Sequence, residues 1–181
     1  KLATQFKDMG DYSFPHSYAR LDNGNVLATL QGQNGKYGAP GGLAELAPDG
    51  AVLRTASAAS GGTPEKEAWP YSLAVVPGKD RAVVSLTEMG WPPFEEFHRG
   101  HQVQIWQPST MKLLATVPLP QADGEYHLDP AEPRVMPDGT VYVGTFTCGV
   151  FRIDGVSGGT PSATRVHTFP GGTTAHNSCS V

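Results

Sequence analysis

The stretch YHLDPAEPRVMPDGTVYVGTFTCGVFRI, residues 126–153, contains the features from which the fold can be predicted. A histidine and two prolines lead into a short apolar run, and a Pro-Asp-Gly turn separates this run from two alternating strand patterns. Such turns between alternating runs are typical of antiparallel hairpins. Two earlier segments follow the same plan, FPHSYARLDNGNVLATL (residues 14–30) and WPYSLAVVPGKDRAVVSL (residues 69–86).

Each repeat continues into further strand patterns, so each is expected to form a sheet of four antiparallel strands. Pro15 and Pro70 lie 55 positions apart along the sequence. Four-stranded units at about this spacing are typical of the blades of a β-propeller. The sequence therefore predicts an all-β protein with a single partial β-propeller domain, and a β-sandwich is the alternative. The predicted blades cover approximately residues 12–57, 69–120 and 126–170, and residues 172–181 are expected to begin another.

The predicted blades are longer than the usual ~40–50 residues. We expect the extra length in the loops between the second and third strands, such as the glycine-rich residues 31–42 and residues 87–100. Trp91 and the prolines after it form a stiff apolar segment in the second of these loops. Long loops in compact domains are often functional. This segment is predicted to be a lid over the channel mouth or a packing plug.

Three blades do not close a ring, because propellers typically have four to eight. An open arc would also leave strand edges unprotected. We therefore expect a seven- or eight-bladed ring whose remainder comes from a longer chain or from another chain. Because Lys1 stands where a Met would begin a chain, a leader is expected to have been removed. This predicts a periplasmic or secreted protein, with a cytoplasmic one as the alternative.

Composition excludes two classes of partner. The net charge of −4 gives no basic surface for nucleic acid. No apolar run approaches the ~20 residues of a membrane-spanning helix. The 22 glycines and 16 prolines among 181 residues are typical of many short strands and turns. The partner predicted by elimination is a small molecule or another protein.

Two cysteines, Cys148 and Cys179, are too few for a disulfide framework and match no zinc motif. We first interpret them as a buried thiol and a loop thiol. A single bridge between them is the alternative if the compartment is oxidising.

Several blocks of the sequence, PHSYARLDNGNVLATLQG, WPYSLAVV, HQVQIWQPSTMKLLATVPLP, DPAEPRVMPDGTVYVGTFTCGVFRI and HNSCSV, carry a family resemblance. The chain resembles the selenium-binding protein 56 family, and is most similar to its divergent bacterial branch. The resemblance implies a β-propeller, and some members of that family are copper-dependent methanethiol oxidases. It therefore implies a copper-dependent oxidoreductase acting on a small thiol or another small sulfur compound. A non-catalytic propeller that binds a ligand or partner protein through its loop face is the alternative.

The repeat also predicts where a site could form. The first strand of each blade lines the channel of a propeller, so repeat-equivalent residues near its start should face one axis. His16 lies eight positions before the turn glycine Gly24, and Tyr71 holds the matching place in the second unit. The residues expected to converge are His16, Tyr71, His127, Glu132 and His176.

Three of these residues are candidate metal ligands, since imidazoles from separate blades suit copper or zinc. They are His16, His127 and His176. Taken alone, a histidine before a strand is more often a solvated loop residue, and this interpretation is preferred for His98 and His101. Cys179 lies close to His176, and a thiolate favours Cu(I).

Glu132 has two interpretations. A buried, unpaired carboxylate is costly, so Arg134 is predicted to be its partner. The carboxylate could instead orient a metal-ligating imidazole from outside the metal's own shell of ligands.

Overall fold

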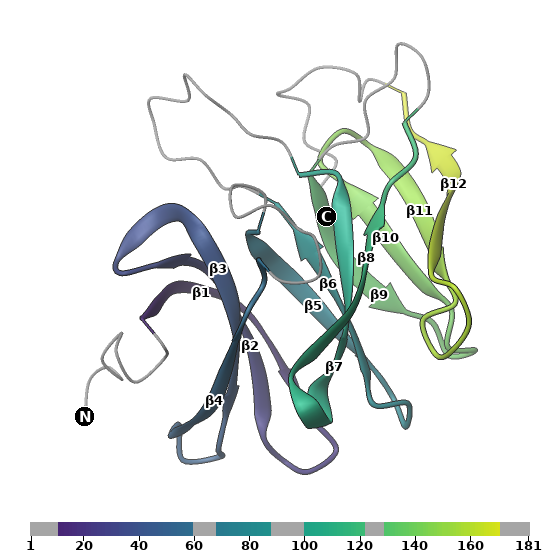
Figure 1. The fold of residues 1–181 in the computed structure, drawn as a ribbon. Helices are drawn as coiled ribbons and strands as arrows, with labels where there is room; N and C mark the ends of the chain where they lie inside the picture. Colours follow the sequence, from purple (N-terminus) through teal and green to yellow (C-terminus); the bar gives the residue numbers. More distant parts are fainter. Residues whose placement is uncertain (1–10, 60–67, 88–99, 122–128, 171–181) are drawn as a thin grey trace.

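The computed structural model describes residues 11–59, 68–87, 100–121 and 129–170 (Figure 1). In this part of the chain, twelve strands form three four-stranded antiparallel sheets. The first sheet contains β1 (Tyr12–Arg20), β2 (Val26–Gln33), β3 (Lys36–Leu46) and β4 (Val52–Ser57). The second contains β5 (Pro70–Val76), β6 (Arg81–Leu86), β7 (Gln102–Gln107) and β8 (Lys112–Pro118), with the short 3-10 helix η3 (Pro108–Thr110) before β8. The third contains β9 (Pro130–Val135), β10 (Val141–Thr145), β11 (Gly149–Asp154) and β12 (Ser162–Thr168).

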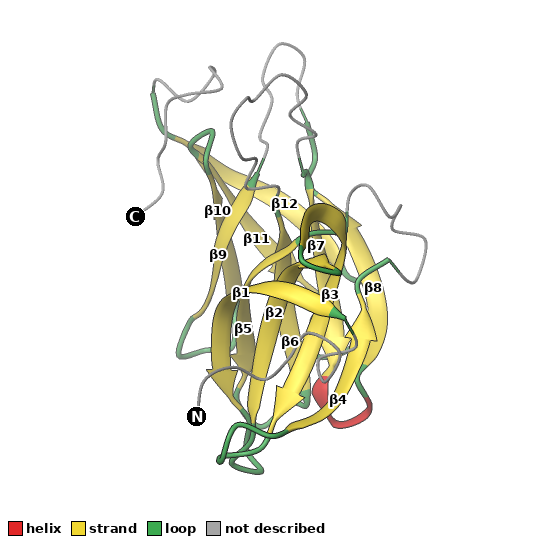
Figure 2. Cartoon of the chain, turned by 90° about the vertical axis from the view of Figure 1, so that its left-hand side faces the viewer, coloured by secondary structure: helices red, strands yellow, loops and turns green. Residues whose placement is uncertain are grey.

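Within each sheet the strands follow one another in sequence order, and the sheets stack face to face (Figure 2). The first strands of the three sheets are neighbours, because β5 contacts both β1 and β9. This is the blade arrangement of a β-propeller, in which first strands line the axis. The predicted fold class is confirmed: the chain is all-β, with propeller-type blades. Among the described residues, no helix has the length and apolar composition to cross a membrane.

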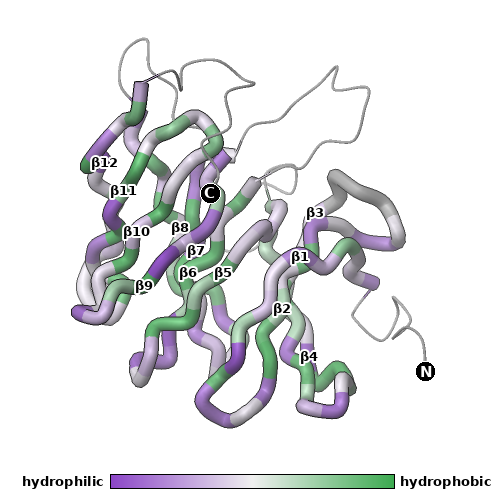
Figure 3. The backbone as a smooth tube through the Cα atoms, turned by 180° about the vertical axis from the view of Figure 1, so that it is seen from behind, coloured by the Kyte–Doolittle hydropathy of each residue, from purple (hydrophilic) through white to green (hydrophobic). Residues whose placement is uncertain are grey.

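Two apolar cores lie between the sheets, and they follow from the alternation of side chains along each strand (Figure 3). One lies between the first and second sheets and includes Leu27, Leu43, Val84 and Trp106. The other lies between the second and third sheets and includes Val83, Ile105, Val143 and Phe151. The second sheet therefore buries both of its faces.

The prediction of a loop at residues 31–42 is wrong. β2 and β3 continue through this region and form a hairpin whose turn is Asn34–Gly35, where both residues have positive φ (54° and 70°). Such a pair suits a two-residue hairpin turn. Gly41 lies in β3 because a Cβ there would collide with the backbone of Leu30. The extra length of the first blade therefore lies in its strands.

Polar contacts also join the sheets. Arg54 on β4 donates from its guanidinium to the carbonyls of Ser109 (2.8 Å) and Pro108 (3.0 Å) in η3. Gln31 Nε2 donates to the carbonyl of Thr87 at 3.1 Å, and the Thr87 hydroxyl donates to the carbonyl of Pro130. Gln31 lies on the first sheet, Thr87 directly follows β6 of the second, and Pro130 begins β9 of the third. Hydrogen bonds therefore run across all three described sheets.

Candidate functional site

The innermost strands β1, β5 and β9 share a β-bulge at the same place in the repeat. In each, the strand advances three residues where its neighbour advances two. A bulge re-aims the side chains beside it, and bulges are over-represented next to active sites. The bulged residues are His16–Ser17, Tyr71–Ser72 and Ala131–Glu132.

Hydroxyl groups on the neighbouring strands hold two of these bulges. The Ser17 N–H donates to Thr29 Oγ1 at 3.0 Å, and the Ser72 N–H donates to Ser85 Oγ at 3.1 Å. The Thr29 hydroxyl also donates to the carbonyl of Tyr71 at 2.8 Å, which ties the first bulge to the second. The backbone beneath His16 and Tyr71 is therefore fixed by hydrogen bonds within and between the sheets.

Aromatic rings from three sheets meet at these bulges. The His16 ring lies 3.8 Å from the Tyr71 ring, centroid to centroid, with 31° between their planes. The Tyr71 ring contacts Phe146 edge-on, with centroids 5.8 Å apart and an interplanar angle of 72°. His16 is exposed, whereas Tyr71 and Phe146 are half-buried. This row of rings, the aromatic row hereafter, offers an accessible surface with two half-buried members.

Electrostatics fix the protonation states of two members of the row. Desolvation lowers the pKa of His16, and the Tyr71 backbone hydrogen bond and the charge of Glu132 offset this only in part. Desolvation and Glu132 both raise the pKa of Tyr71. At neutral pH, His16 is therefore a neutral imidazole and Tyr71 an intact phenol that can donate a hydrogen bond.

Glu132 lies close enough to act electrostatically on both rings, and it forms the expected ion pair with Arg134. Both partners of the pair are exposed. Exposed ion pairs contribute little to stability, typically about 0–1 kcal/mol. Glu132 is therefore free of a demanding structural role and remains available to a ligand.

The structure brings together His16, Tyr71 and Glu132 of the predicted set. The other predicted site residues lie outside the described residues; they are Trp91, His127, His176 and Cys179. Within the part of the chain that the structure describes, no three His, Cys, Asp or Glu side chains are grouped so as to hold a metal ion. His101, which is described, follows the masked residues before β7 and belongs to no such group.

Cys148 is buried and disulfide-bonded, so the interpretation of a buried free thiol is wrong. Cys179, the only other cysteine in the sequence, lies outside the described residues. Cys148 has a positive φ of 70° and sits in the tight turn between β10 and β11, where its N–H donates to the carbonyl of Thr145 at 3.0 Å. It therefore supplies no thiolate to a site in this state.

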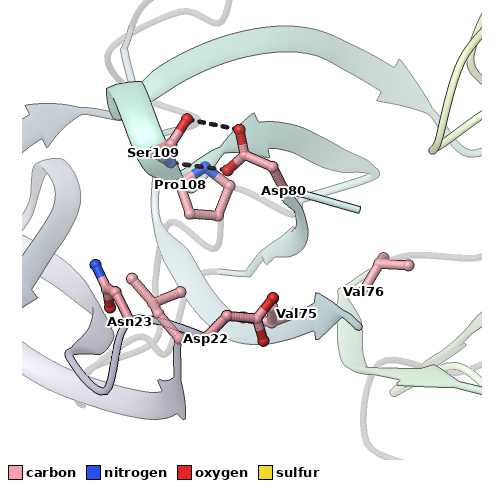
Figure 4. A pocket seen from close by; sticks show the side chains of 8 residues that line it. Asp22, Asn23, Val75, Val76, Asp80, Pro108 and Ser109 are labelled. Carbon is pink, nitrogen blue, oxygen red and sulfur yellow. Dashed lines mark hydrogen bonds between the residues drawn. The ribbon is translucent and has the colours of Figure 1, made fainter. Parts of the chain in front are cut away.

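A pocket of about 360 Å³ lies between the first and second sheets, at the opposite end of β5 from Tyr71 (Figure 4). The Asp80 carboxylate at its edge accepts hydrogen bonds from the Ser109 N–H (2.9 Å), the Ser109 hydroxyl (2.6 Å) and Gln107 Nε2 (2.8 Å). Burial alone would raise the pKa of Asp80, but these bonds lower it below its ordinary value. Asp80 therefore fixes η3 to the β5–β6 turn.

Sequence reasoning missed Phe146, which it placed at the end of a strand. The residue follows β10, and its N–H donates to the carbonyl of Asp129 at 3.0 Å. The signal that could have found it is the repeat itself. Counting two residues past the partner of each bulge leads from Thr29 to Gln31 and from Gly144 to Phe146.

The fold and the inner-strand bulges together define a class of protein, a β-propeller with a candidate site on its first strands. No family model and no curated protein sequence matches the chain. Its structure is similar to a protein of unknown function from Bacteroides caccae, with a TM-score of 0.52 and 16% identity over 86% of this chain and 45% of that one.

It is also similar to a hypothetical selenium-binding protein from Sulfolobus tokodaii, with a TM-score of 0.66 and 14% identity over 91% of this chain and 38% of that one. The chain thus spans less than half the length of either structure. At these identities the likeness shows a shared fold, and membership of the selenium-binding protein 56 family stays a prediction.

Proposed function

We propose that the chain contributes a binding site for a small sulfur compound to a β-propeller. The observation that carries this proposal is the convergence of His16, Tyr71 and Phe146 from three sheets into the aromatic row. Divalent sulfur packs favourably against aromatic rings, by about 0.3–1.5 kcal/mol per contact. The resemblance of the sequence to a family with methanethiol oxidases supports the same class of ligand.

Polar groups beside the row would orient such a ligand. The phenol of Tyr71 can donate a hydrogen bond, the neutral imidazole of His16 can accept one, and the Glu132 carboxylate attracts a partial positive charge. A small number of convergent polar groups on a largely apolar surface is the usual composition of a small-molecule site.

The proposal is tested with a matched pair of probes, diethyl sulfide and diethyl ether, which differ in one atom. Titration into the natively purified protein should shift the NMR signals of the Tyr71 and His16 rings, and the sulfide should bind more tightly than the ether. Tyr71→Leu should abolish that preference, whereas Tyr18→Leu, an exposed tyrosine on β1, should retain it. Equal binding of both probes by the wild-type protein would refute the sulfur preference.

A second candidate function is a copper-dependent oxidoreductase acting on a small thiol. The lowered pKa of His16 favours it, because a metal ligand must be a neutral imidazole. The described residues do not complete a copper site, since they bring one imidazole to the bulges and Cys148 is disulfide-bonded. We propose His127 and His176 as the further ligands, and no reaction step is derived through the metal.

Metal content separates the two candidates. Inductively coupled plasma mass spectrometry on the natively purified protein should find about one copper per chain if the oxidoreductase proposal holds. His16→Ala, His127→Ala and His176→Ala should then each lose copper, and His167→Ala, a histidine on the outer strand β12, should keep it. A metal-free protein that still prefers diethyl sulfide would be a non-catalytic ligand-binding propeller. A partner protein bound through the loop face remains the other form of that alternative.

A further inference from the structure

The residue two positions after the partner of each bulge is equivalent in the three sheets, and it is polar in the first two. Gln31 on the first sheet donates to the carbonyl of Thr87 on the second. Thr87, its equivalent, donates to the carbonyl of Pro130 on the third. In both sheets this position therefore makes a hydrogen bond that joins one sheet to the next.

The third sheet departs from this pattern at two adjacent positions of the repeat. Phe146 stands where Gln31 and Thr87 stand, and its equivalence to Thr87 is supported by the backbone. The N–H of Thr87 donates to the carbonyl before Pro70, and the N–H of Phe146 donates to the carbonyl before Pro130, each at 3.0 Å.

The second departure is Gly144, which pairs opposite the bulge where the other sheets have hydroxyl residues. A Cβ placed on Gly144 would have no atom within 4 Å, so the space that a side chain would occupy is open. The third sheet thus replaces two polar contacts with open space and an aromatic ring.

The turn that carries Phe146 is held firmly. Thr145 Oγ1 accepts a hydrogen bond from the Gly149 N–H at 2.9 Å and lies 3.2 Å from Thr147 Oγ1. The disulfide-bonded Cys148 is buried in the same turn. Phe146 is therefore a half-buried ring on a fixed backbone, pressed edge-on against Tyr71.

We infer that Phe146 is the residue that sets the specificity of the aromatic row, by supplying the apolar wall against which the sulfur of the ligand packs. This inference rests on the proposed sulfur-compound site and adds the residue that makes the site selective. The open space beside Gly144 and the loss of the inter-sheet hydrogen bond at position 146 both favour a role in binding over one in joining blades.

The test uses the repeat's own residue. Phe146→Thr installs the side chain that Thr87 carries at the equivalent position, so the backbone is known to accept it. NMR titrations of the full chain with diethyl sulfide and diethyl ether would give the ratio of the two dissociation constants. Loss of one sulfur–aromatic contact should reduce that ratio by about threefold. The control is Phe169→Thr, an exposed phenylalanine of the third sheet that contacts His167, which should leave the ratio unchanged.

The outcomes separate this inference from the proposed function. If the wild-type protein shows no preference for the sulfide, the proposed site fails and the inference falls with it. If the wild-type protein prefers the sulfide and Phe146→Thr retains the same ratio, the site stands and Phe146 is not its specificity residue. The Tyr71 ring signals of the unliganded variant report whether the rest of the row has moved. A reduced ratio with these signals near their wild-type positions supports the inference, and a reduced ratio with displaced signals overturns it in favour of a purely structural role.

Discussion

Glu45 is a carboxylate with only 2% of its surface exposed, and three side chains balance it. Its oxygens accept hydrogen bonds from Asn25 (2.6 Å), Asn23 (3.2 Å) and Arg54 Nε (2.6 Å). Burial alone would raise the pKa of Glu45, but these hydrogen bonds bring it below its ordinary value. Because Arg54 also bonds to η3 of the second sheet, this one carboxylate supports a contact between blades.

We expect Glu45→Gln to lower the free energy of unfolding at neutral pH by about 2 kcal/mol, the usual range for hydrogen bonds to a charged group. A lowered native pKa means that the charged form stabilises the fold. That contribution is complete above the unfolded-state pKa of about 4.3 and is lost as the pH falls through the lower native value. Urea unfolding at a series of pH values should therefore show the difference between wild type and Glu45→Gln shrinking below about pH 4. Asp154→Asn, in an exposed ion pair, is the control and should change stability little. A difference that stays constant with pH would contradict the assignment.

At the scale of single residues, the sequence predicts part of the candidate site. The repeat offset places His16, Tyr71 and Glu132 together because equivalent positions on neighbouring first strands must face the same axis. It does not indicate Phe146, whose ring meets Tyr71 only because the turn after β10 is folded by Thr145 and its neighbours. Nor does it decide the state of Cys148, since pairing of cysteines depends on spatial proximity.

The bulge in each first strand is the element that distinguishes these blades. Thr29 and Ser85 place hydroxyls under the bulges of the first two sheets, whereas the third sheet has Gly144 there. The position is open to a larger side chain, and glycine in a strand loses more backbone entropy on folding than other residues do. The third bulge is therefore the least supported of the three.

We expect Gly144→Ser to raise the free energy of unfolding by about 1 kcal/mol, from one added hydrogen bond to the N–H of Glu132 and a smaller entropy loss on folding. Chemical denaturation with an unchanged m-value would measure it. Gly144→Ala is the matched variant, because it removes the backbone freedom without adding a hydroxyl. A serine variant no more stable than the alanine variant would mean that the hydroxyl does not bind the bulge.

At the scale of elements, strands with clear alternation were predictable and glycine-rich ones were not. Residues 31–42 were predicted as a loop because five glycines in twelve residues usually indicate one. The structure requires glycine at Gly41 and Gly42 for a different reason, since the neighbouring strands and Tyr12 leave no space for a Cβ. Such close packing depends on residues distant in sequence, so local composition alone could not indicate it.

Across the whole molecule, the three sheets are joined by the apolar cores between them and by a few buried hydrogen bonds. The repeat period predicted the blades and their order, because a four-stranded unit that buries both faces must stack on another. It could not predict which polar residues connect one blade to the next. These are Thr29, Gln31 and Thr87, each of which reaches a backbone carbonyl of the following sheet.

Thr87 is central to this connection, since its carbonyl accepts from Gln31 and its hydroxyl donates to the carbonyl of Pro130. We expect Thr87→Val, which keeps the shape of the side chain, to lower the free energy of unfolding by about 1 kcal/mol. The loss should be felt most at β9, the first strand of the third sheet. Amide hydrogen exchange should therefore show lower protection in residues 130–135 than in β2 and β3.

Thr164→Val, an exposed threonine on β12, is the control for the same chemical change and should alter neither stability nor exchange. Because β9 also carries Glu132, loosening it should weaken binding of diethyl sulfide as well as exposing amides to exchange. Uniform loss of protection across all three sheets would indicate that the blades unfold as one unit. In that case the Thr87 hydroxyl would stabilise the whole arc of blades, and the docking of β9 would not depend on it in particular.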